Sequence, residues 1–208
     1  MKALLLVDIQ NDFLPGGALE VPRGDEVIPV ASRLARSADL VVATKDWHPP
    51  DHKSFAPNHP GRKPGDVIDL NGTEQVLWPP HCVQHTPGSE LAPGLETSQI
   101  AEIFYKGIDP EIDSYSAFFD NRHLRATGLG DYLKERGAEE IFIAGLATDY
   151  CVRWTALDAA ELGFGTVVVE DGCRGIDLNP GDIKRALEEM RRAGVRIVGS
   201  DSLLGAAE

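Results

Sequence analysis

Residues 2–8, Lys-Ala-Leu-Leu-Leu-Val-Asp, decide the fold because an unbroken apolar run ends there in a carboxylate. A short run of this kind is typical of a strand buried on both faces of a parallel sheet. Five further short runs rich in apolar residues follow along the chain, at residues 40–44, 102–106, 141–144, 166–170 and 195–198. We therefore predict a sheet of six strands.

Helical patterns lie between these strands. Residues 27–34 repeat apolar side chains at helical spacing, and a helix over 128–136 is predicted to end at Gly137. A third helix follows Thr148, which is expected to cap it, and a fourth opens with Asn179 as cap and Pro180 at its first position. The alternation predicts an α/β fold of three layers, with helices on both faces of a mostly parallel sheet.

Composition narrows the class of protein. The chain has 208 residues and a net charge of −13, and we expect one domain over residues 1–208. A chain with this negative charge lacks the basic surface that binds nucleic acid or anionic membranes. No apolar run approaches the length of a membrane span, so we expect a cytoplasmic protein. Its three cysteines are then expected to be thiols: Cys82, Cys151 and Cys173.

Several reactive side chains end predicted strands. Ligands of such sheets bind beyond the carboxyl ends of the strands, where Asp8, Asp46, Lys106 and the turn at 146–151 are expected to converge. Residues 45–100 contain little periodicity and many proline, glycine and histidine residues. We predict that this long irregular stretch serves function.

Cys151 is the candidate nucleophile. In the first turn of a helix, the dipole and free N–H groups favour a thiolate and also an oxyanion. Asp8 would be the general base, and Lys106 the cation that stabilises the thiolate. Each residue also has an ordinary structural interpretation. Cys151 would be a small buried apolar residue, Asp8 a loop cap and Lys106 a surface lysine at a strand end.

A metal site is indicated by the histidines. Asp46 and His48 share one side of an extended segment, while His52 and His81 follow in the irregular stretch. Imidazole and carboxylate ligands suit zinc, manganese or iron. Cys82 is not expected to join them, because neighbouring residues of a strand point to opposite faces. The alternative is histidines that hydrogen-bond only to the backbone.

The chain lacks a dinucleotide-binding glycine motif, a phosphate-binding loop and a serine-hydrolase elbow. Five segments instead resemble those of the isochorismatase-like hydrolase superfamily, and within it the nicotinamidases (pyrazinamidases). The resemblance covers almost the whole chain. It rests on residues 7–13 (VDIQNDF), 44–49 (TKDWHP), 78–84 (WPPHCVQ), 105–107 (YKG) and 145–152 (GLATDYCV).

This resemblance implies the sheet order 3-2-1-4-5-6 and a metal-dependent cysteine amidohydrolase that converts nicotinamide to nicotinic acid and ammonia through a thioester, in NAD salvage. It also implies a non-proline cis peptide at Leu146-Ala147. One divalent metal ion, with zinc favoured over iron or manganese, is expected as cofactor, and a homo-oligomer is compatible with general trends. The implied site residues are a triad of Asp8, Lys106 and Cys151; oxyanion donors at Ala147 and Cys151; metal ligands Asp46, His48 and His81, with His52 reaching the metal directly or through water; and pocket residues Phe13, Trp78 and Tyr115.

His85 follows Gln84 at a position where many relatives have glycine, which leaves the fine substrate preference open. Other cysteine amidases of the superfamily, acting on N-carbamoylsarcosine or ureidoacrylate, are the main alternative, but they typically lack the metal ligands. Isochorismatases proper do not depend on this cysteine. A third hypothesis is a non-catalytic binding protein with the same fold. The complete triad argues against it.

Overall fold

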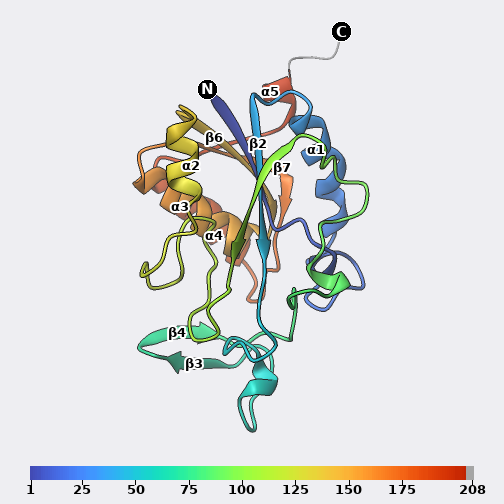
Figure 1. The fold of residues 1–208 in the computed structure, drawn as a ribbon, viewed down its shortest axis with the longest axis vertical. Helices are drawn as coiled ribbons and strands as arrows, with labels where there is room; N and C mark the ends of the chain where they lie inside the picture. The colour runs from blue at the N-terminus through green and yellow to red at the C-terminus, as the bar shows by residue number, and fades with distance from the viewer. Residues whose placement is uncertain (205–208) are drawn as a thin grey trace.

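Six parallel strands form the central sheet of the computed structural model, which describes residues 1–204 (Figure 1). Their order is β5-β2-β1-β6-β7-β8, and every neighbouring pair is parallel. Counted along the chain within this sheet alone, the order is 3-2-1-4-5-6, as predicted. The strands are β1 (Lys2–Val7), β2 (Leu40–Asp46), β5 (Ile100–Lys106), β6 (Glu140–Leu146), β7 (Gly165–Arg174) and β8 (Arg196–Val198).

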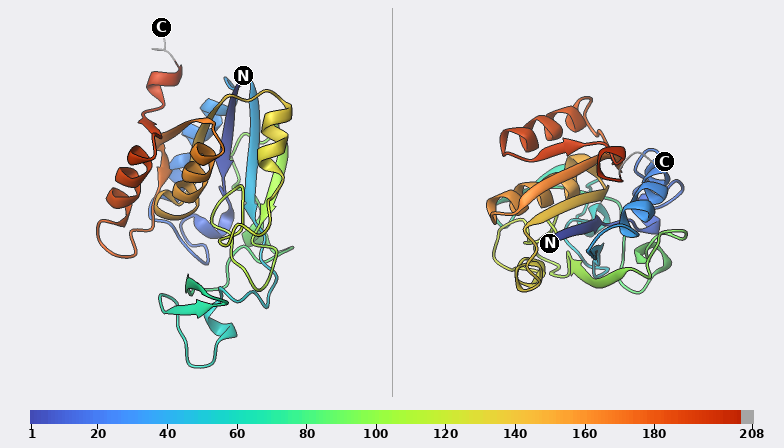
Figure 2. Two further views of the ribbon diagram at one scale, coloured as in Figure 1. Left: turned by 90° about the vertical axis from the view of Figure 1, so that its left-hand side faces the viewer. Right: turned by 90° about the horizontal axis from the view of Figure 1, so that it is seen from above.

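The helices cover both faces of the sheet (Figure 2). Because strand side chains alternate, Leu4 and Leu6 of β1 pack with α1 (Val27–Ala35) on one face. Ala3, Leu5 and Val7 pack on the other face, in a core shared with α2 (Leu129–Glu135), α3 (Arg153–Glu161) and α4 (Asp182–Arg192). The predicted α/β fold of three layers is confirmed.

Two predicted helix starts are wrong. The fourth helix begins at Asp182, after Gly181 in a left-handed conformation with φ 92°. Asn179 therefore lies outside the helix and donates its backbone N–H to the Asp182 carboxylate at 2.8 Å. Ala147, and not Thr148, occupies the N-cap before the π-helical turn η5 (Thr148–Val152), and no side chain caps that turn.

The stretch 45–100 is less irregular than predicted. It contains an antiparallel hairpin of β3 (Val67–Leu70) and β4 (Thr73–Val76), joined by Asn71-Gly72. Both linking residues have positive φ, which is the signature of the two-residue turn that Asn-Gly favours. The prediction missed it because each strand has only four residues. Short helices complete the chain: η1 (Asn11–Phe13), η2 (Gly24–Glu26), η3 (Ala56–Asn58), η4 (Pro87–Ser89) and α5 (Asp201–Leu204).

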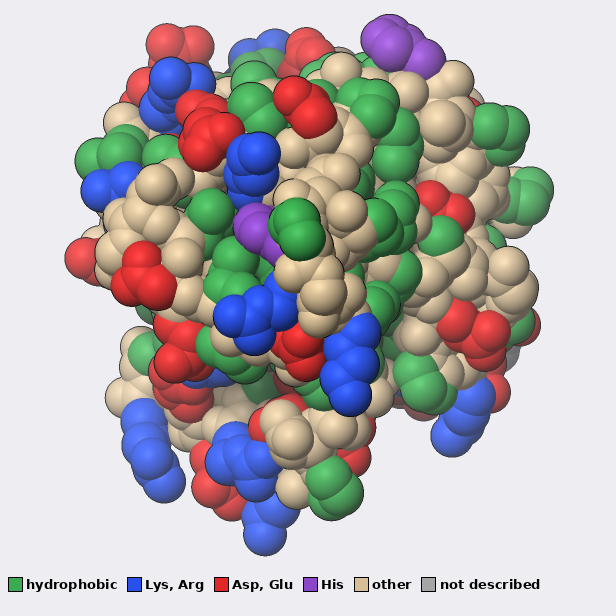
Figure 3. Space-filling view, turned by 90° about the horizontal axis from the view of Figure 1, so that it is seen from below, with side chains coloured by type: hydrophobic (Ala, Val, Ile, Leu, Met, Phe, Trp, Pro, Cys, Tyr) green, Lys and Arg blue, Asp and Glu red, His purple; other side chains and the backbone are tan. Residues whose placement is uncertain are grey.

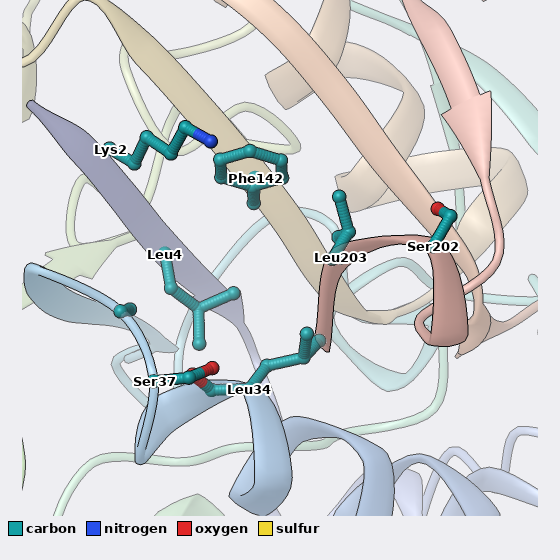
Figure 4. A pocket seen from close by; sticks show the side chains of 8 residues that line it. Lys2, Leu4, Leu34, Ser37, Phe142, Ser202 and Leu203 are labelled. Atoms are coloured by element: carbon teal, nitrogen blue, oxygen red, sulfur yellow. The ribbon is translucent and has the colours of Figure 1, made fainter. Parts of the chain in front are cut away.

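The carboxyl ends of the strands face the hairpin, at the lower end of Figure 1. A separate cavity of about 150 Å³ lies at the opposite end, between β1, β6, α1 and α5, where Lys2 and Phe142 border it (Figure 4). None of the predicted site residues lines that cavity. Within residues 1–204, no helix has the length and apolar character needed to cross a membrane.

Candidate active site

A buried ion cluster lies where β1, β2 and β5 end. The Lys106 ammonium contacts the carboxylate of Asp46 and lies 2.9 Å from Asp8 Oδ2. It also donates to the backbone carbonyl of Ser114 at 3.0 Å. Thr44 Oγ1 donates to Asp8 Oδ1 at 2.7 Å, so neighbouring strands hold both oxygens of this carboxylate. Parallel register places the three charged side chains together, because Asp46 pairs directly with Lys106.

Cys151 reaches this cluster from the turn after β6. Its Sγ lies 3.4 Å from Lys106 Nζ and forms one group with the carboxylates of Asp8 and Asp46, within 4.8 Å of one another. The turn is π-helical, and Val152 N donates to Ala147 O at 3.0 Å across it. The Leu146-Ala147 peptide is cis, as expected. Within residues 1–204, the Ala147 N–H has no hydrogen-bond partner.

Burial and charge set the proton affinities of this cluster. Burial, only partly offset by Lys106, raises the pKa of the Cys151 thiol well above its ordinary value. Burial also raises the pKa of Asp8. For Lys106, burial works against the charge, but Asp46 and Asp8 outweigh it and raise the pKa of the ammonium well above its usual range. Cys151 is therefore a thiol at rest, beside a carboxylate with raised proton affinity and a permanent cation.

Two histidines point ring nitrogens at the carboxylate of Asp46. Nδ1 of His48 donates to the Gly107 carbonyl at 3.0 Å, and Nδ1 of His81 donates to the Pro79 carbonyl at 2.8 Å. A carbonyl only accepts, so in the neutral rings both Nε2 atoms keep their lone pairs. They lie 3.5 and 3.7 Å from Asp46 Oδ2. Ligands about 2.0–2.1 Å from a tetrahedral zinc ion are separated by similar distances, so this set fits a divalent metal.

His52 differs from the other two histidines. Its Nδ1 accepts the backbone N–H of Ser54 at 3.1 Å and lies 2.7 Å from the Ser54 hydroxyl. Burial, together with nearby His48, lowers the pKa of His52 to about 4, so the ring is neutral. A neutral ring with Nδ1 as acceptor carries its proton on Nε2. That buried Nε2 has no protein partner within residues 1–204, and the ring groups with His48 and Asp113.

One small cavity connects these groups. Its volume is about 20 Å³, and its wall is formed by Phe13, Leu19, Asp46, Trp78, His81, Asp113, Tyr115, Ala147, Tyr150, Cys151 and Ile176. The three predicted pocket aromatics are thus brought together with the predicted nucleophile and two of the predicted metal ligands. Cys82 does not line this cavity and packs in a buried core with Leu4 and Leu6. His81 and Cys82 do not belong to a strand, so the expected alternation of strand faces does not apply to them.

Several cavity residues escaped the sequence analysis. Asp113 accepts the side-chain amide of Gln75 at 2.9 Å, and the same amide nitrogen lies 3.2 Å from the hydroxyl of Tyr115. Gln75 belongs to the hairpin, so recognising Asn71-Gly72 would have been the signal for its inward face. Tyr150 has no sequence signal of its own beyond its place before Cys151, so its position in the cavity wall was not predicted. For Asp113 no local pattern exists, because an irregular segment brings it to the cavity.

The end of the molecule that carries the hairpin is seen in Figure 3. Acidic and basic side chains are mixed on this face, around patches of hydrophobic side chains. The reactive cluster lies below the surface, since the exposed fractions of Asp8, Lys106 and Cys151 are 0%, 1% and 6%.

The isochorismatase domain model matches residues 2–202, and the chain belongs to this family. A nicotinamidase of Escherichia coli is 48% identical over 200 residues, covering 94% of this chain and 93% of that protein. A solved nicotinamidase/pyrazinamidase of Acinetobacter baumannii superposes with a TM-score of 0.95 at 49% identity, covering 98% of each chain. A pyrazinamidase of Pyrococcus horikoshii, solved in complex with zinc, gives a TM-score of 0.76 at 40% identity, covering 95% of this chain and 98% of that chain.

Proposed function

We propose that this protein is a cytoplasmic, metal-dependent amidohydrolase that converts nicotinamide, and also pyrazinamide, to the corresponding acid and ammonia. One observation carries the proposal. Asp46 contacts both Lys106 and the two free histidine nitrogens, which joins a cysteine site to a metal site beside one cavity. The activities named for the relatives support the substrate, and the free cysteines suit a reducing compartment.

The reaction begins with the Cys151 thiol. Asp8 takes the thiol proton as the sulfur attacks the carboxamide carbon, and Lys106 stabilises the anion that forms. The N–H groups of Ala147 and Cys151 are the proposed donors to the oxyanion. Asp8 returns the proton to the leaving nitrogen, so ammonia departs and a thioester remains. Water then adds to the thioester carbonyl, releasing the acid and restoring the thiol.

Asp46, His48 and His81 are the residues that would hold the metal, for which we favour zinc. When bound, the metal would act as a Lewis acid toward the ring nitrogen of the substrate and so orient the ring. Phe13, Trp78 and Tyr115 would hold the faces and edge of the ring. His52 presents an N–H rather than a lone pair, so we assign it a water-mediated contact with the metal.

The direct test is ammonia release from nicotinamide by the purified, zinc-loaded protein. We expect release by the wild type and a loss of at least about a thousandfold in the Cys151→Ala variant. Cys173→Ala is the matched control, because this second buried thiol lies on β7 and its removal should leave the rate close to that of the wild type. Zinc content is measured for each protein.

Zinc bound without ammonia release would overturn the substrate assignment. Release from an N-carbamoyl or ureido amide instead would identify another cysteine amidase of the family. Appreciable turnover by Cys151→Ala would exclude the covalent route.

A further inference from the structure

The cavity above Cys151 is narrow and lined by aromatic rings. Its volume is about 20 Å³, and it is partly open to its surroundings. The proposed substrate has to pass these rings to reach Cys151, so the ring that moves most easily controls entry.

Most of the large side chains in this wall are held in place. The indole N–H of Trp78 donates to the Tyr115 hydroxyl at 3.2 Å, and Gln75 bonds to the same oxygen. His81 is fixed by its hydrogen bond to the Pro79 carbonyl. Phe13 is 5% exposed and packs against the His81 ring, with a centroid separation of 5.5 Å.

Tyr150 is held differently. Its ring touches Trp78 and Tyr115 only through edge contacts, at centroid separations of 4.9 and 5.5 Å. Within residues 1–204, no protein atom forms a hydrogen bond with its hydroxyl, and the side chain is half-buried. Rotation of this ring breaks no hydrogen bond, so it costs less than movement of its aromatic neighbours.

Tyr150 also has open space on its other side. A groove of about 640 Å³ lies between the hairpin and α4, and Tyr150 borders both this groove and the inner cavity. Ile176, on another part of the inner wall, does not border the groove. Tyr150 therefore lies between the narrow cavity at Cys151 and a much larger groove.

We propose that the Tyr150 ring is the gate and the size filter of the active site. The aromatic carboxamide enters from the groove between the hairpin and α4 while the ring swings outward, and the ring then closes over it. In the closed position the ring limits substrates to a single small aromatic ring. The chemical part of this proposal rests on the proposed function, but the access route to Cys151 does not.

Alkylation of Cys151 tests the access route without any turnover. The zinc-loaded protein is treated with N-phenylmaleimide, and modification of each cysteine is followed by mass spectrometry. Cys82 and Cys173 are 0% and 3% exposed and serve as internal references. We expect Tyr150→Ala to speed modification of Cys151 by at least about tenfold, and Tyr150→Phe to react like the wild type because the hydroxyl has no partner.

Ile176→Ala is the matched control, since it enlarges the cavity without opening it to the groove. We expect less than about a threefold change in the rate for this variant. Equal rates for Tyr150→Ala and wild type, or an equal acceleration by Ile176→Ala, would overturn the gate. Tyr150→Leu, which keeps more packing volume, replaces Tyr150→Ala if thermal melting shows that the latter is unfolded.

The size filter is tested with quinoline-3-carboxamide, which is nicotinamide with a fused second ring. We expect Tyr150→Ala to raise kcat/KM for this amide relative to nicotinamide by about tenfold or more. An unchanged ratio would refute the filter. If no protein releases ammonia while the alkylation pattern holds, the proposed function fails and the access route stands.

Discussion

Asp46 is shared by two groups of side chains, and this sharing defines the chemistry of the site. Burial alone would raise its pKa, but Lys106 and His48 outweigh burial and hold the pKa well below the ordinary value. The single ammonium of Lys106 faces two buried carboxyl groups. A further positive charge would therefore balance the charge of the cluster. A divalent ion between Asp46 and the two histidines would supply it.

The tautomer of His52 leads to a prediction at the same scale. Because its Nδ1 accepts the Ser54 amide, His52 offers a donor to water and no lone pair to the metal. We expect His81→Ala to lose zinc at concentrations that saturate the wild type, whereas His52→Ala should weaken zinc binding by only about 10–100-fold. Zinc affinity is measured by chelator competition, which requires no turnover.

His123→Ala is the control, because this half-exposed histidine pairs with Asp158 and borders none of the cavity at Cys151. An equal loss of zinc in His52→Ala and His81→Ala would make His52 a direct ligand and reject the assigned tautomer.

At the scale of elements, β1 and β6 approach each other unusually closely just before the turn that carries Cys151. Gly145 has φ 138°, and a Cβ there would lie 2.0 Å from the Val7 carbonyl oxygen. Val7 immediately precedes Asp8, so any shift at this contact also moves the proposed base. Glycine is required here by both space and conformation.

Gly145→Ala should therefore destabilise the fold by at least about 3 kcal/mol, through overpacking and backbone strain together. Gly199→Ala is the matched control, since nothing lies within 4 Å of its added Cβ and a change within about 0.5 kcal/mol is expected. Urea denaturation gives both free energies of unfolding. A loss below about 1 kcal/mol in Gly145→Ala would contradict this close approach.

The elements also show where sequence patterns succeed. Residues 2–7 and 27–34 were predicted well because each has an apolar pattern that fits one kind of element. The unbroken run fits a buried strand, and the helical spacing fits a helix with one buried face. The hairpin at 67–76 was missed because each strand is short and only partly buried. The start of the fourth helix was misplaced because Gly181 is the N-cap, and Asn179 and Pro180 lie before the helix. The Asp182 carboxylate accepts the backbone N–H of Asn179 there.

Ion pairs between distant segments make the stability of the whole molecule depend on pH. Glu26 receives hydrogen bonds from Arg23 and from Arg174 on β7, and these lower its pKa to about 2. A lowered pKa stabilises the fold above the ordinary value of 4.5, and this contribution is lost as the pH falls from about 4.5 toward 2.

We expect Glu26→Gln to melt at most about 4 °C below the wild type at pH 6, and the gap to narrow as the pH falls below 4.5. Melting temperatures from pH 6 to pH 3 provide the test. Glu135→Gln is the control, since Glu135 is exposed on α2 and forms no ion pair within residues 1–204. A gap that stays constant with pH would mean that the Glu26 carboxylate contributes no charge-dependent stability.

The sequence alone determined the sheet, its covering helices and the set of reactive residues at the strand ends. Apolar runs force strands to be buried, and parallel strands bring their carboxyl ends to one edge, so Asp8, Asp46 and Lys106 had to meet. Tertiary structure alone decided the position of Asp113, the tautomer of His52 and the place of Tyr150 between cavity and groove. These depend on contacts between segments with no shared periodicity, such as the hairpin and the turn after β6, and only the folded chain places such segments together.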